Sequence, residues 1–299
     1  MSAIVVAFLN FKGGVGKTAN VVNLAAGLAA THQQRVLVVD LDAQCNSSLW
    51  LLGKPLFKRH TEDPTRSVAQ AFRDALRGTK LFRFDEAVVR GVPRSEKDFK
   101  LIAGLDLLPA SIDLLEVEEH LAHRPPEGVY RVLHGCLKPR LKDYDWVLID
   151  CAPNFFALTK NAVFTARHLA IPYIPDFLSL VGFQSLARLV EGFGARVGGQ
   201  KTALGRTRIS ALIVNRFKQT GNVFKQGLLE LEKLAGDLKA QGLIHPQARL
   251  LQPPVRDCVK VAEAPAVHLP IALHAPDSIG GRDYAALVDD FKRHFEEVE

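Results

Sequence analysis

The feature that most constrains this chain is the stretch at residues 10–18, Asn-Phe-Lys-Gly-Gly-Val-Gly-Lys-Thr. A short apolar run at residues 3–9 precedes it, and apolar residues at helical spacing follow it. A glycine loop between a buried strand and a helix suits phosphate binding, because backbone N–H groups and the helix N-terminus converge on the anion. The alternative is a plain glycine turn with two solvated lysines.

We therefore predict a phosphate-binding loop. Its glycines let the backbone approach the phosphates, its last lysine reaches the β- and γ-phosphates, and its threonine hydroxyl binds Mg²⁺. The residues expected in these roles are Gly13, Gly14, Gly16, Lys17 and Thr18.

The loop departs from the usual pattern at its start. Phe11 stands where the pattern has a glycine, and an additional lysine, Lys12, follows it. The run from Lys12 to Thr18 resembles the deviant Walker A motif of the ParA/MinD family of ATPases. The resemblance implies that Lys12 reaches across a dimer interface to the partner subunit's nucleotide. It also implies ATP/ADP and Mg²⁺ as cofactors, and further nucleotide contacts from Val15 and Ala19.

Acids end two of the predicted strands. Residues 35–42 end in Asp40 and Asp42, and four apolar residues lead to Asp150. Carboxylates at the C-terminal ends of parallel strands point into the ligand crevice of a doubly wound sheet. Asp150 is therefore predicted to be the Walker B acid, beside the metal bound by Thr18. The alternative for Asp150 is a surface acid that caps a buried strand.

The segment at residues 42–46 resembles the family's Asp-Pro-Gln-Gly-Asn switch segment, with Ala43 in place of Pro and Cys45 in place of Gly. The resemblance implies that Asp42 lies near the attacking water and the water shell of the metal. Asp40 is expected to be structural. Ala152 stands where the family has the first of two prolines after Walker B. These departures leave the details of switching open.

Strands and helices alternate from end to end, which predicts one α/β domain over residues 1–299 with a doubly wound, mostly parallel sheet and helices on both faces. Residues 53–104 are expected to be an elaborated segment with a helix near 68–76. Asn215, which ends a predicted strand, matches the family's adenine-contacting residue. Pro254 lies in a C-terminal third that also resembles the family, and is expected to contact the nucleotide. A lone Asn at a strand end is otherwise often a turn former.

Basic residues are concentrated between residues 188 and 225, where eight stand against one acid. This segment carries net +7, whereas the whole chain carries +6, so the remainder is close to neutral. A local basic excess favours a polyanion such as DNA, although a solvated basic face is the alternative. The predicted DNA contacts are Arg188, Arg216, Lys218 and Lys225.

The resemblance implies an ATPase that dimerises with ATP, binds DNA without sequence preference and partitions cargo with a ParB-like adaptor that stimulates hydrolysis. We expect a cytoplasmic, nucleoid-associated protein, since no signal peptide or membrane span is evident and the four cysteines form no Cys-x-x-Cys pair. With the loop at residue 12, no N-terminal helix-turn-helix domain is expected.

Two other classes of function are open. A MinD-like regulator of division needs a basic amphipathic helix at its C-terminus, whereas residues 295–299 are mostly acidic. A metabolic enzyme on the same fold needs groups for its own substrate. Four scattered histidines are read as packing or surface residues: His168, His245, His268 and His274. The identity of the cargo is left open.

Overall fold

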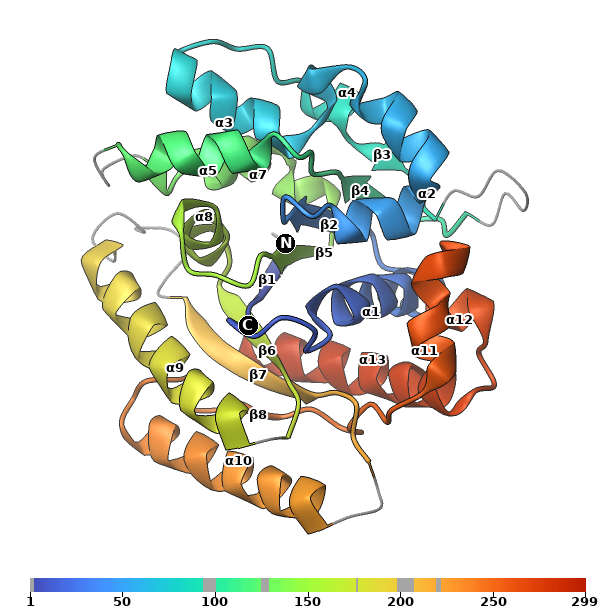
Figure 1. Cartoon of the computed structure of the whole chain (residues 1–299), viewed down its shortest axis with the longest axis vertical. Helices are drawn as coiled ribbons and strands as arrows, with labels where there is room; N and C mark the ends of the chain where they lie inside the picture. Colours follow the sequence, from blue (N-terminus) through green and yellow to red (C-terminus); the bar gives the residue numbers. More distant parts are fainter. Residues whose placement is uncertain (1–2, 94–100, 125–128, 176, 198–206, 219–221) are drawn as a thin grey trace.

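One sheet runs through the structure, with the strand order β3-β4-β2-β5-β1-β6-β7-β8 (Figure 1). The computed structural model describes residues 3–93, 101–124, 129–175, 177–197, 207–218 and 222–299. β3 pairs with β4 antiparallel, and the other neighbouring strands are parallel, as predicted. The strands are β1 (Ile4–Phe8), β2 (Val36–Leu41), β3 (Val89–Arg90), β4 (Leu105–Leu108), β5 (Trp146–Cys151), β6 (His168–Tyr173), β7 (Arg208–Val214) and β8 (Arg249–Leu250).

Helices cover both faces of the sheet, because its central strands are apolar on both sides. In β1, Val5 and Ala7 belong to one apolar core, whereas Val6 and Phe8 belong to the other. The longer helices are α1 (Lys17–His32), α2 (Asn46–Thr61), α3 (Val68–Arg77), α5 (Leu114–Ala122), α8 (Ala157–Thr165), α9 (Phe177–Val197), α10 (Asn222–Ala240) and α13 (Ile279–Val298). The shorter ones are η1 (Pro64–Arg66), α4 (Phe84–Ala87), α7 (Val132–Leu137), η2 (Lys138–Asp143), α11 (Val259–Glu263), η4 (Ala264–Val267) and α12 (Ile271–His274).

The described part of residues 53–104 is largely helical. The predicted helix near residues 68–76 is present as α3, whose Val68 and Phe72 are buried in the same apolar core as the sheet. α2 extends into this segment past a break at Gly53 (φ 70°, ψ 155°). Residues 94–100 of the segment lie outside the described residues. Within the described ranges, no helix has both the length and the apolar content needed to span a bilayer.

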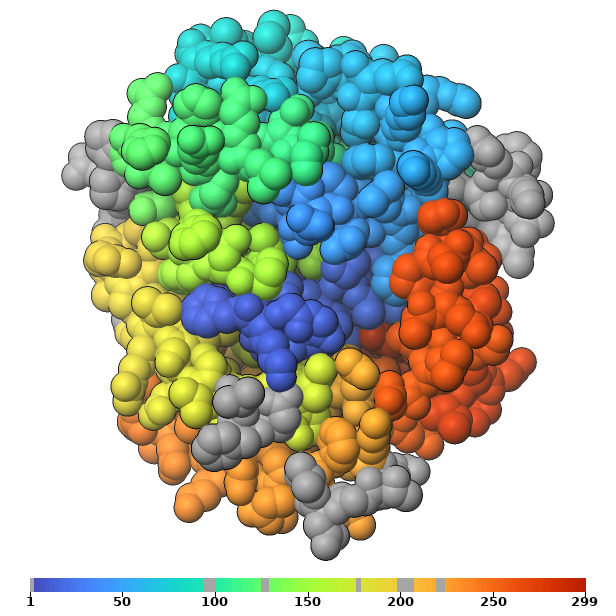
Figure 2. Space-filling view, in the orientation of Figure 1, coloured from blue at the N-terminus to red at the C-terminus, as the bar shows by residue number. Residues whose placement is uncertain are grey.

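The C-terminal ends of the parallel strands meet along one edge of the sheet, and the loops that leave them gather there. The loop after β1 is dark blue at the centre of the face in Figure 2, between the yellow-green α8 and the orange-red C-terminal elements. Such an edge is where ligands bind in open α/β sheets.

Candidate functional site

The glycine loop connects β1 to α1, which begins at Lys17. Gly14 (φ 74°) and Gly16 (φ 93°) adopt left-handed backbone conformations, which glycine tolerates best. A Cβ atom built on Gly13 or Gly14 meets nothing within 4 Å, so both residues face open space. A Cβ on Gly16 comes within 3.1 Å of the Asn215 side chain. The loop therefore leaves an open cradle above it and no room behind it.

The two loop lysines differ in their surroundings. Lys17 is 8% exposed, and its Nζ donates to the carbonyl oxygens of Asn10 and Lys12, both at 3.3 Å. Burial lowers the pKa of Lys17, and the nearby Asp150 carboxylate opposes this effect. Lys12 is exposed, and its Nζ donates to Ser179 Oγ at 3.4 Å. Lys17 points into the cavity described below, whereas Lys12 is not among its lining residues.

Asp150, the predicted Walker B acid, is buried beside the start of α1. The Oδ2 atom of Asp150 accepts hydrogen bonds from Thr18 Oγ1 at 2.8 Å and from Ser47 Oγ at 2.6 Å. Its Oδ1 atom is buried and has no hydrogen-bond partner among the described residues. Burial raises the pKa of Asp150 to about 6. An unpaired acceptor of this kind is explained when a water or an ion occupies the space next to it.

The other two acids lie on either side of the end of β2. Asp40 is opposite Asp150 in the β2–β5 register, and its carboxylate accepts from Ser48 Oγ, Ser48 N and Asp42 N at 2.7, 2.9 and 3.2 Å. Burial and the Asp150 charge raise the pKa of Asp40 to about 8. Asp42 is half-buried and lines the cavity. Asp40 is thus bonded within the fold, and Asp42 faces the cavity.

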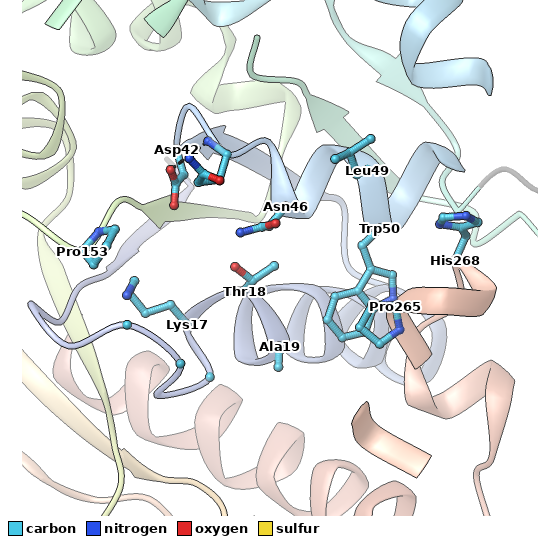
Figure 3. A pocket seen from close by; sticks show the side chains of 14 residues that line it. Lys17, Thr18, Ala19, Asp42, Asn46, Leu49, Trp50, Pro153, Pro265 and His268 are labelled. Atoms are coloured by element: carbon cyan, nitrogen blue, oxygen red, sulfur yellow. Dashed lines mark hydrogen bonds between the residues drawn. The ribbon is translucent and has the colours of Figure 1, made fainter. Parts of the chain in front are cut away.

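A cavity of about 490 Å³ opens above the loop (Figure 3). It brings together Lys17 and Thr18 from the start of α1 with Asp42, which follows β2. It also extends along α2 to a wall that the sequence did not indicate. The lining residues are Gly13, Gly14, Gly16, Lys17, Thr18, Ala19, Asp42, Gln44, Asn46, Leu49, Trp50, Pro153, Pro265 and His268.

The far wall joins α2 to the C-terminal third of the chain. Trp50 Nε1 donates to the carbonyl oxygen of Leu269 at 2.9 Å, which holds the indole beside η4. His268 has a left-handed backbone (φ 58°), and its Nδ1 is buried without a hydrogen-bond partner among the described residues. Neither residue has a local sequence signal, since the contact joins segments more than 200 residues apart.

Asn215, expected to contact adenine, and Pro254, expected to contact the nucleotide, lie outside this cavity. Asn215 is 3% exposed, and its Nδ2 donates to the carbonyl oxygen of Val15 at 3.0 Å, so it supports the loop from behind. Neither Asn215 nor Pro254 is among the lining residues. Their contacts with the nucleotide stay predictions.

The predicted DNA contacts are exposed, but two of them share an acid. Arg216 Nε lies 3.6 Å and Lys218 Nζ lies 3.9 Å from the Asp257 carboxylate. Lys225 is exposed near the start of α10, and Arg188 is exposed on α9, which packs against α10. Other basic residues of the segment, Lys201 and Arg206, lie outside the described residues. The net charge of the segment therefore overstates the charge that is free of partners.

Cys45, one of the departures from the family pattern, has a backbone conformation that favours glycine. It is the N-cap residue of α2 and has a left-handed backbone (φ 55°), which suits the glycine of the family's switch segment. We expect Cys45→Gly to change the free energy of unfolding by less than about 1 kcal/mol, because relief of strain offsets the reduced burial of apolar surface. Cys45→Val is expected to cost more than about 2 kcal/mol, since β-branched residues avoid this region. Urea denaturation measures both.

The control is Cys151→Gly. Cys151 is equally buried but lies in β5, where glycine relieves no strain and adds flexibility to the unfolded chain. This variant is expected to lose about 1–3 kcal/mol of stability. Equal losses of stability in Cys45→Gly and Cys151→Gly would contradict the interpretation that the backbone at Cys45 is strained.

The arrangement fits a nucleotide polyphosphate with a divalent cation. It combines an open glycine cradle, a buried lysine, a threonine hydroxyl and a carboxylate oxygen that no described residue contacts by a hydrogen bond. Backbone N–H groups and a lysine are the usual partners of phosphate, and hydroxyl and carboxylate oxygens suit Mg²⁺. The described residues contain no cluster of three or more side chains of the His, Cys, Asp or Glu type able to hold a metal ion by themselves.

Comparison with known proteins gives consistent matches. A family profile described as an AAA domain matches residues 3–201. The chromosome partitioning protein ParA of Caulobacter vibrioides is 30% identical over 95% of this chain and 91% of its own length. The cell division protein PomZ of Myxococcus xanthus is 28% identical over 95% of this chain and 76% of its own. The crystal structure of cobyrinic acid a,c-diamide synthase from Mycobacterium smegmatis, with an ATP analogue and magnesium, has a TM-score of 0.68 and 24% identity, covering 99% of this chain and 97% of that one.

Proposed function

The chain belongs to the ParA/MinD family of ATPases, and from this premise we propose that it is an ATP-dependent dimerisation switch that binds DNA and positions cargo. The observation that carries the proposal is the contrast between the loop lysines. Lys17 is buried at the cradle, whereas Lys12 is exposed and is not among the residues that line its own cavity. An exposed lysine at this position can be reached by a second subunit that docks on this face.

ATP and Mg²⁺ are the cofactors of the proposed switch. The glycine N–H groups and Lys17 would bind the phosphates, and Thr18 and Asp150 would hold Mg²⁺, which neutralises phosphate charge when bound. Asp42, at the cavity wall, would orient the attacking water and the water shell of the metal. Lys12 would contact the partner subunit's nucleotide. Hydrolysis is proposed to be slow alone, to be stimulated by a ParB-like adaptor, and to return the protein to monomers.

DNA is the proposed binding partner of the dimer. Arg188, Arg216, Lys218 and Lys225 are exposed and basic, which supports contacts to backbone phosphates and binding without sequence preference. Dimerisation brings two copies of the patch to one duplex, so the affinity is expected to rise with ATP. A protein of this kind would associate with the nucleoid.

A mobility-shift titration with ATP and Mg²⁺ at two salt concentrations tests DNA binding. We expect Lys218→Ala/Lys225→Ala to weaken binding alike on all sequences. The log–log salt slope is expected to fall by about one for each phosphate that is no longer neutralised, or about four across the dimer. Asp257→Asn is expected to strengthen binding, because it releases Arg216 and Lys218 from their shared acid.

The matched control is Lys58→Ala, which removes an exposed lysine outside the basic segment and is expected to leave the titration unchanged. If the parent protein produced no mobility shift of DNA at low salt, the proposal that it binds DNA would be wrong. This result would favour the second candidate, an ATPase that positions a protein assembly or regulates division. The similarity to PomZ favours that candidate, since its name describes a cell division protein.

A further inference from the structure

Two adjacent serines at the start of α2 contact two different acids. Ser47 and Ser48 are both completely buried. Ser47 Oγ donates to Asp150 Oδ2 at 2.6 Å, and Ser48 Oγ donates to Asp40 Oδ2 at 2.7 Å. Since Asp40 and Asp150 are paired in register on β2 and β5, the first turn of α2 spans the ends of both strands.

The two serines are held differently. Ser48 is tied to the framework three times, because its backbone N–H also donates to Asp40, and its Oγ accepts from Ala110 N at 3.0 Å. Ser47 donates to Asp150 Oδ2, which also accepts a hydrogen bond from the Thr18 hydroxyl of the phosphate loop. A serine in the first turn of a helix often bonds to the nearby backbone, yet this hydroxyl is directed to another strand. The contact joins residues 103 positions apart.

The bond from Ser47 helps to fix the orientation of the Asp150 carboxylate. Two hydroxyls, from Thr18 and Ser47, occupy Oδ2 and fix the carboxylate, while the buried Oδ1 has no partner among the described residues. A carboxylate that is fixed in this way presents one oxygen without the entropy cost of orienting it on binding. Groups that orient metal-site residues in this manner typically affect metal affinity by about 10- to 100-fold.

We propose that Ser47 is a positioning residue of the Mg²⁺ site, which fixes Asp150 and ties the start of α2 to the metal. The inference rests on the proposed function, in which Thr18 and Asp150 hold Mg²⁺. Cys45, the N-cap residue of α2, follows Asp42 by three residues, so the predicted switch segment leads directly into α2. The bond from Ser47 to Asp150 therefore links the metal site to the segment that carries Asp42.

The test is a Mg²⁺ titration read by the melting temperature, with a non-hydrolysable ATP analogue held at saturation. For Ser47→Ala, we expect the Mg²⁺ concentration that gives half of the stabilisation to rise about tenfold. Without Mg²⁺, binding of the analogue is expected to match that of the parent protein. Ser47→Thr, which keeps the hydroxyl, is expected to restore the parent midpoint.

Ser48→Ala is the matched control. It removes the neighbouring hydroxyl, and we expect a lower melting temperature with an unchanged Mg²⁺ midpoint. A Ser47→Ala midpoint within twofold of the parent value would overturn the inference, as would an equal shift in Ser48→Ala. A parent protein that gains no stability from Mg²⁺ with the analogue would instead overturn the metal role in the proposed function, and the inference with it.

Discussion

Lys17→Ala is expected to lose about thirtyfold or more in ATP affinity, because it removes the buried cation from the phosphate site. Truncating one partner of a buried charge pair costs about 2–5 kcal/mol, and about 1.4 kcal/mol corresponds to a factor of ten. Lys17 Nζ also bonds to two carbonyl oxygens of the loop, so its removal loosens the cradle as well. Isothermal titration calorimetry with ATP and Mg²⁺ measures the affinity.

Lys54→Ala is the control for this experiment. Lys54 is exposed on α2 and does not line the cavity, so its removal is expected to leave affinity within about twofold. Circular dichroism checks that both variants keep the parent fold. If Lys17→Ala bound ATP like the parent protein, the phosphate-binding assignment would be wrong.

The sequence predicted the parts of the site that consecutive residues encode. The loop at residues 10–18 lies between a strand and a helix as expected, and Asp150 lies near the end of a buried strand, beside Thr18. These predictions succeed because strand, loop and helix leave a local pattern of apolar and glycine residues. The parallel pairing of most strands follows from the alternation of strands and helices.

The features that the sequence missed depend on contacts between distant segments. Trp50 and His268 line the same cavity although they lie in distant parts of the chain, and the bond from Ser47 to Asp150 requires two strand ends to be neighbours. The counted charge of residues 188–225 did not reveal that Asp257 faces Arg216 and Lys218. In each case the residue types are visible in the sequence, whereas their partners are visible only in the tertiary structure.

The second large effect is expected at the interface between subunits. In the proposed dimer, each Lys12 contacts the partner subunit's nucleotide, so Lys12→Ala removes two charge-assisted contacts from one symmetric interface. At about 1.5 kcal/mol for each contact, dimerisation with ATP is expected to weaken about a hundredfold. Binding of ATP to the monomer is expected to change by less than about threefold, since Lys12 is not among the residues that line its own cavity.

Light scattering with ATP and Mg²⁺, over a range of protein concentrations, measures dimerisation, and calorimetry measures binding to the monomer. These two measurements distinguish the roles of the lysines. Lys17→Ala is expected to lose both ATP binding and dimerisation, whereas Lys12→Ala is expected to keep ATP binding and lose dimerisation. Ser179→Ala removes an intramolecular partner of Lys12 without touching its charge, so it is expected to retain dimerisation. Normal dimerisation of Lys12→Ala would show that Lys12 is an ordinary surface lysine, and the proposed contact between subunits would then be wrong.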